Sequence, residues 1–120
     1  PRLIDAPGLD ADATTVATYV AETWGNTGPG VAPWHETADD YLTASFSGYF
    51  ARRDLAVDDL PASATAVRAT SRPTPTGERV TVTLEQIHAS ALIPWRLVTV
   101  EMLVVDVDGR ALVASFEVLA

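Results

Sequence analysis

Apolar residues recur at helical spacing near the start of the chain. They lie three and four residues apart over about two turns, which predicts an amphipathic helix with one buried stripe. Asp10 and Asp12 are suitable N-caps for this helix, and Gly25 is a natural C-terminal stop. The residues of the stripe are Val16, Tyr19, Val20 and Trp24.

A second helical region follows a glycine-rich loop. Thr37 with Asp40 three residues later matches a capping box, with the Asp40 carboxylate near the positive end of the helix. Pro33 and Trp34 are placed to start a short turn of helix before it. The predicted buried face of this second helix consists of Leu42, Phe46, Tyr49 and Phe50.

The apolar period changes to two from about Ser63 onward, which is typical of β-strands. The third of four predicted strands is apolar on both faces, so we expect it to be central and covered on both sides. Asp108-Gly109 predicts a two-residue hairpin between the third and fourth strands. The four strands are predicted over about residues 64–69, 80–85, 96–107 and 110–119.

The register of the second strand is open at its end. Gln86 and His88 continue the phase of the core-facing residues Val80 and Val82, which would bring both polar side chains to the concave face of the sheet. Ile87, however, is apolar on the opposite phase, and a bulge there would reverse the alternation.

Helices first and a strand meander afterwards indicate the α+β class. We expect one domain over residues 1–120, with helices within residues 10–53 and antiparallel strands within residues 63–120. The N-terminal helices should pack on one face of a curved, four-stranded antiparallel sheet.

Composition narrows the choice of partners. The net charge is −8, and all eight basic residues are Arg, so nucleic acid and anionic membrane surfaces are disfavoured partners. Cysteine is absent, which excludes disulfides, thiol nucleophiles and thiolate zinc sites. No apolar run reaches the roughly 18 residues that a membrane span needs. The chain opens on Pro1, so a membrane anchor before it is an expectation that the sequence leaves open.

Most motifs that resemble functional sites have a simpler explanation. Asp39 and Asp40 are adjacent on a helix and point about 100° apart, so they do not converge as an acid–base pair. The run from Asp106 to Gly109 resembles the opening of a calcium loop but is explained by a hairpin turn. We therefore expect neither a metal nor a cofactor.

Two groups of side chains remain as candidates for a site. Trp24, Gln86 and His88 are candidates to line a pocket on the concave side of the sheet, although a structural histidine is the commoner case. Trp95, which follows a proline in a loop, and Trp34 are candidates for contacts with a protein partner.

The order of elements resembles the nuclear transport factor 2-like (cystatin-like) superfamily. The segment of residues 16–24, then Trp34, then Tyr41-Leu42-Thr43 and Phe46 is similar to actinobacterial conjugation accessory proteins and to the bridging subunit of type IV secretion systems. This resemblance covers nearly the whole chain, through apolar spacings. It implies a non-catalytic, extracytoplasmic assembly domain, tethered through an absent N-terminal anchor, that binds other protein subunits or a second copy of itself.

The same superfamily also contains isomerase-like and cyclase-like enzymes, which leaves an alternative open. In those members, acid–base groups lie in the cone between helix and sheet. The residues to test for such a role are Tyr19, Asp40 and His88, with Tyr19 donating to a developing oxyanion while a carboxylate moves a proton. A cytoplasmic location is the corresponding alternative to the cell envelope.

Overall fold

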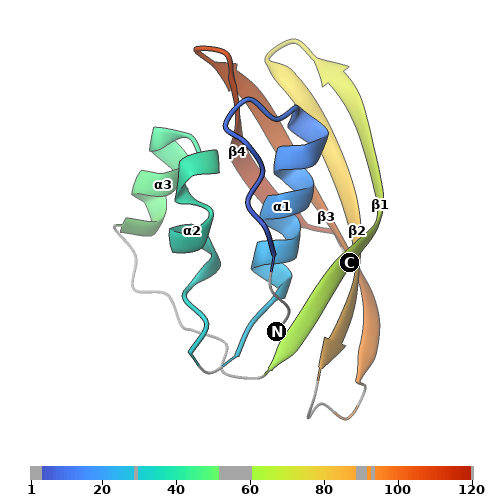
Figure 1. Ribbon diagram of the computed structural model, residues 1–120. Helices are drawn as coiled ribbons and strands as arrows, with labels where there is room; N and C mark the ends of the chain where they lie inside the picture. The colour runs from blue at the N-terminus through green and yellow to red at the C-terminus, as the bar shows by residue number, and fades with distance from the viewer. Residues whose placement is uncertain (1–3, 29, 52–60, 89–91, 93, 120) are drawn as a thin grey trace.

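The computed structural model describes residues 4–28, 30–51, 61–88, 92 and 94–119. Helices occupy one side of a single antiparallel sheet, whose strands lie in the order β1-β2-β3-β4 (Figure 1). This confirms the α+β class, with helices first and a meander of neighbouring strands after them. The elements are α1 (Ala13–Gly25), α2 (Trp34–Thr37), the 3-10 turn η1 (Asp39–Tyr41), α3 (Ala44–Ala51), β1 (Ala62–Thr74), β2 (Gly77–His88), β3 (Trp95–Val107) and β4 (Arg110–Val118).

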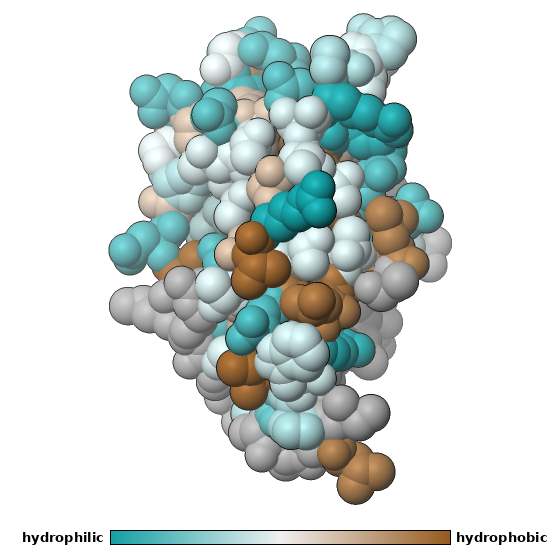
Figure 2. Space-filling view, turned by 90° about the vertical axis from the view of Figure 1, so that its right-hand side faces the viewer, coloured by the Kyte–Doolittle hydropathy of each residue, from teal (hydrophilic) through white to brown (hydrophobic). Residues whose placement is uncertain are grey.

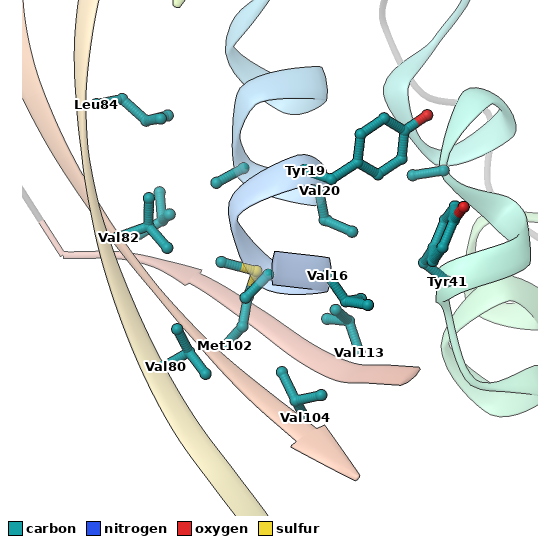
Figure 3. Close-up of a cluster of buried hydrophobic side chains, with 14 of the residues drawn as sticks. Val16, Tyr19, Val20, Tyr41, Val80, Val82, Leu84, Met102, Val104 and Val113 are labelled. Atoms are coloured by element: carbon teal, nitrogen blue, oxygen red, sulfur yellow. The ribbon is translucent and has the colours of Figure 1, made fainter. Parts of the chain in front are cut away.

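Helix α1 forms where the apolar stripe predicted it. Asp12 is its N-cap, and its carboxylate accepts a hydrogen bond from the Thr15 backbone N–H at 2.8 Å. Val16 and Val20 are fully buried against the inner face of the sheet, as Figure 3 shows. The core between α1 and the sheet also contains Val80, Val82, Leu84, Val100, Met102, Val104 and Val113.

The second helical region is broken where a continuous helix was expected. Thr37 ends α2 and does not cap a helix, so the predicted capping box with Asp40 is wrong. The N-terminal cap is Thr43, whose hydroxyl accepts from the Phe46 N–H at 3.3 Å. The reason is long-range, because Leu42 adopts an extended conformation and forms a parallel bridge with the edge strand β4. A helix cannot run through an extended residue.

The buried face predicted for this region is correct in part. Leu42 is buried, and Phe46 packs against Trp34 with ring centroids 6.3 Å apart. Tyr49 is 41% exposed, so its predicted burial is wrong; the helix begins only at Ala44, which shifts the face that it turns to the sheet. The side chain of Phe50 lies outside the described residues.

The first two strands are longer than their apolar alternation indicated, whereas the last two lie within one residue of their predicted bounds. Strand β1 continues to Thr74, and β2 begins at Gly77, directly after a two-residue turn. The alternation in β2 runs unbroken to its end, with Gln86 only 4% exposed and Ile87 50% exposed. The open register is therefore settled without a bulge in β2. One irregularity lies in β1, between Ala66 and Arg68.

Strand β3 is an inner strand, as expected, but it is not covered on both sides. The even-numbered residues from Val98 to Val104 face α1 and are buried, and Val100 and Met102 are fully so. On the opposite face Leu97 is 51% exposed, because the described helices all pack on the other side of the sheet (Figure 1). The hairpin to β4 is confirmed, with positive φ angles of 54° at Asp108 and 84° at Gly109.

The end of α1 is tied to the outer edge of β1. The Asn26 side chain donates to the Ala64 carbonyl at 3.2 Å and accepts from the Ala64 N–H at 3.3 Å. The Glu22 carboxylate accepts from the Ala66 N–H at 2.9 Å. These bonds fix the helix relative to the sheet and position the polar end of β2 beneath Gly25.

Candidate functional site

The three residues proposed for acid–base chemistry have different neighbours. Tyr19 lies in the middle of α1, where its ring packs edge-on against Tyr41 with centroids 5.1 Å apart. Asp40 is exposed in η1, and its backbone carbonyl, not its carboxylate, accepts from the Arg110 guanidinium. His88 lies at the end of β2 beside Gln86. Nothing in these contacts joins the three side chains in one cavity.

The space between α1 and the sheet is filled by apolar side chains. Figure 3 shows Val82 and Met102 pointing from the sheet toward α1, and Val16 of the helix beside Val113 of β4. Each of these four is almost fully buried. A ligand that entered between them would have to displace close-packed atoms, which costs free energy at each lost contact.

An open groove of about 280 Å³ lies on the other side of α1, toward the N-terminal segment. Tyr19 reaches it, and the Tyr41 hydroxyl beside it donates to the Pro7 carbonyl. Burial, with a smaller contribution from Tyr19, raises the pKa of Tyr41, so the Tyr41 hydroxyl is protonated at neutral pH. The groove is lined by Ile4, Asp5, Pro7, Thr14, Thr15, Thr18, Tyr19 and Glu22.

Two of the pocket candidates form a polar cluster at the end of the sheet. The Gln86 amide nitrogen donates to the Gly25 carbonyl at 2.8 Å, and its oxygen accepts from Arg96 Nε at 2.9 Å. His88 Nε2 lies 3.1 Å from the same oxygen. Because the Gln86 amide is occupied on both sides, this cluster joins α1, β2 and β3 as a structural connection. His88 Nδ1 is buried and has no hydrogen-bond partner within the described chain.

Trp24 and Trp34 lie apart from this cluster. Both pack on Phe116 of β4, with ring centroids 5.3 Å away for Trp24 and 5.2 Å for Trp34. The three rings form an aromatic layer between the helices and the edge strand. Trp34 is therefore a half-buried packing residue, and Trp24 packs against β4.

The most conspicuous apolar surface lies on the face of the sheet turned away from the helices. Trp95 is 50% exposed and is paired with Ile87 across the two inner strands. Leu97 follows on the same face, and Leu119 continues β4 opposite Thr99, to which its N–H donates at 2.8 Å. Figure 2 views this face and shows apolar side chains gathered in its lower half. We name Ile87, Trp95, Leu97 and Leu119 the outer-face patch.

The upper half of the same face is charged and is arranged by sign. Arg68 and Arg72 lie on β1, and Arg79 lies opposite Arg72 on β2. On the far side of the sheet, Glu101 of β3 lies opposite Glu117 of β4. One ion pair, between Arg79 and Glu101 at 2.9 Å, joins the two sides.

The sequence pointed to one member of the outer-face patch, Trp95, but missed the other three. The signal for Leu97 was visible, since β3 is apolar on both phases, but it was interpreted as burial on both faces. The same ambiguity conceals Ile87, whose apolar side chain is equally consistent with a register shift. Which face the helices cover was the missing information.

The part of the chain that the structure describes contains no cluster of three potential metal-ligating side chains. In the same part, every helix is too short or too polar to cross a membrane. No protein-family model, curated protein or solved structure matches the chain. The case for a function therefore rests on the geometry of the site.

Proposed function

We propose that this chain is a non-catalytic protein-interaction domain that assembles through the outer face of its sheet. The observation that carries the proposal is the outer-face patch, in which Ile87, Trp95 and Leu97 are each about half exposed beside one another. Contiguous apolar surface of a few hundred Å² on a folded domain usually marks an interaction site. A half-exposed tryptophan in such a surface is the residue type most enriched at binding hot spots.

The inner face of the sheet, which packs on the helices, supports an interaction domain rather than an enzyme with a concave pocket. The core side chains fill the space between α1 and the sheet, and Tyr19, Asp40 and His88 have separate surroundings. An acid–base mechanism needs its groups within hydrogen-bond reach of one substrate. The groove beside Tyr19 is lined mainly by threonines, with Asp5 and Glu22 as its carboxylates, and neither Asp40 nor His88 lines it.

We further propose that the fold is of the nuclear transport factor 2-like type and that the domain belongs to a membrane-anchored cell-envelope complex for conjugative transfer or type IV secretion. The support is the resemblance of residues 16–24, Trp34 and the segment 41–46 to proteins of that kind. In such a complex the helices would face away from the contact, and the outer face of the sheet would receive the neighbouring subunit.

Site-specific photo-crosslinking in the native cell tests the proposed function. A photoreactive phenylalanine analogue replaces Leu97 in the outer-face patch, and a control copy carries it at Thr15, which is exposed on α1. We expect a light-dependent protein adduct from position 97 and none from position 15. Mass spectrometry of the adduct identifies the partner, and a secretion or transfer subunit would support the envelope assignment.

The absence of a protein adduct at position 97, in a variant that folds and is expressed at wild-type level, would overturn the interaction function. An adduct of equal yield at both positions would overturn it as well, because contact would then not depend on the outer-face patch.

A further inference from the structure

The charges on the outer face of the sheet balance, although the molecule as a whole is strongly acidic. This face carries three arginines and three glutamates, whereas the entire chain has a net charge of −8. Two copies of the chain therefore repel each other electrostatically over most of their surface. This repulsion is weakest between two outer faces. The residues concerned are Arg68, Arg72, Arg79, Glu85, Glu101 and Glu117.

In the upper half of this face, the two signs are also segregated across the strands. Arg72 and Arg79 are direct cross-strand neighbours, and so are Glu101 and Glu117. Like charges directly opposite each other are unfavourable in an isolated sheet. The Arg79–Glu101 ion pair relieves one charge on each side, but within the described residues neither Arg72 nor Glu117 has an ion-pair partner.

We propose that a second copy of this chain covers the outer face, related to the first by a two-fold axis that runs parallel to the strands. This inference rests on the proposed interaction function and names its partner. Such an axis places β4 of one copy over β1 of the other. Each row of residues paired across one sheet then lies opposite the same row of the other sheet. Two sheets packed face to face at a small angle have this arrangement.

The residues at each level fit that arrangement. Glu117 lies in the same row of the sheet as Thr70, so the axis brings Glu117 of the second copy between Arg68 and Arg72 of the first. At the lower level, Trp95 of each copy lies over Ile87 of the other, because these two residues are paired across the inner strands. Each contact occurs twice, so the interface pairs Glu117 with both arginines and buries both outer-face patches. Glu85, which is paired with Leu97 in its own sheet, comes to lie over Leu97 of the other copy and is the outer-face charge that gains no partner.

The alternative two-fold axis, perpendicular to the strands, is disfavoured by the same pattern. It would turn the second copy end over end and place β1 over β1 and β4 over β4. Arg72 and Glu117 of the two copies would then stay on opposite sides of the interface, and neither would gain an ion-pair partner. The pattern therefore selects the symmetry as well as the surface.

Sedimentation of the purified chain tests the self-association. We expect the wild type to be a dimer at about 100 µM, a concentration at which contacts of micromolar affinity are saturated. Leu97→Arg should convert it to a monomer with an unchanged circular dichroism spectrum. Leu9→Arg, at an exposed leucine of the N-terminal segment, is the matched control and should remain a dimer.

A charge exchange tests the orientation of the two copies. Arg72→Glu and Glu117→Arg should each raise the dimer dissociation constant about tenfold, and the double variant should restore most of the affinity. Within one copy these residues are about three strand spacings apart, roughly 14 Å, which exceeds the screening length of about 8 Å at physiological salt. Restoration in the double variant therefore reports contact between copies.

A monomeric wild type would overturn the dimer, and a double variant that is no tighter than the weaker single variant would overturn the proposed axis. These failures are distinct from failure of the interaction function. If the purified chain is a monomer while position 97 crosslinks to a different protein in cells, the self-association is wrong and the interaction function stands.

Discussion

Gln86 offers a direct test of the register at the end of β2. Replacing it with leucine keeps the size of the side chain but removes the hydrogen bonds to Gly25 and Arg96. Arg96 is exposed and can bind water instead. The main loss of stability therefore comes from the buried Gly25 carbonyl, which loses its hydrogen bond from Gln86. An unsatisfied buried acceptor costs about 1–3 kcal/mol, and we expect Gln86→Leu to lower the free energy of unfolding by about 2 kcal/mol.

Urea denaturation followed by circular dichroism measures this change, at one fixed protein concentration because association adds to the apparent stability. Thr81→Val, on the opposite face of the same strand, is the control and should change the free energy by less than about 0.5 kcal/mol. If Gln86→Leu is as neutral as the control, then Gln86 does not face the core and the described register of β2 is wrong.

Three further changes follow from the packing and the helix cap. Gly77→Ala should destabilise the fold by about 1–3 kcal/mol in urea denaturation, because a Cβ there would lie 2.2 Å from the Val104 carbonyl oxygen; a neutral result would mean that β2 and β3 separate easily. Met102→Ala, which empties a fully buried site, should cost about 2–5 kcal/mol in the same assay, and a smaller loss would indicate a loosely packed core. The Thr15 N–H lowers the pKa of Asp12, so the stability that its ionised form contributes is present above the unfolded pKa and is lost as the pH falls through the folded one. Asp12→Asn should therefore flatten the decline in stability below about pH 4, and an unchanged decline would argue against the cap.

Local patterns predicted the elements whose signals are contained within a few residues. The stripe through Val16 and Val20 located α1, and Asp108-Gly109 located the last hairpin. Thr37 and Thr43 show where such signals fail, because each is a threonine followed by residues that suit a helix. The choice between them depends on Leu42 bridging to a strand some seventy residues later in the chain, which no local window contains.

The candidate site was predictable only in part for a related reason. Alternation placed Gln86 and His88 correctly on the inner face, but their hydrogen bonds depend on where α1 ends. The apolar character of Leu97 does not by itself distinguish a covered face from an exposed one. Trp95 was predicted as a candidate contact residue, and its cross-strand partner Ile87 followed only from the pairing of β2 with β3.

The bonds between the end of α1 and β1 have a consequence for aggregation. An unpaired strand edge is a template to which other chains add, and it is a common origin of fibrils. Here the N–H groups of Ala62, Ala64 and Ala66 are already taken by Thr27, Asn26 and Glu22. The open remainder of β1 carries charged and proline residues, which discourage strand addition: Arg68, Arg72 and Pro73. A chain in which α1 detaches would expose the first half of this edge. The packing of α1 on β1 therefore protects the folded protein against fibril formation.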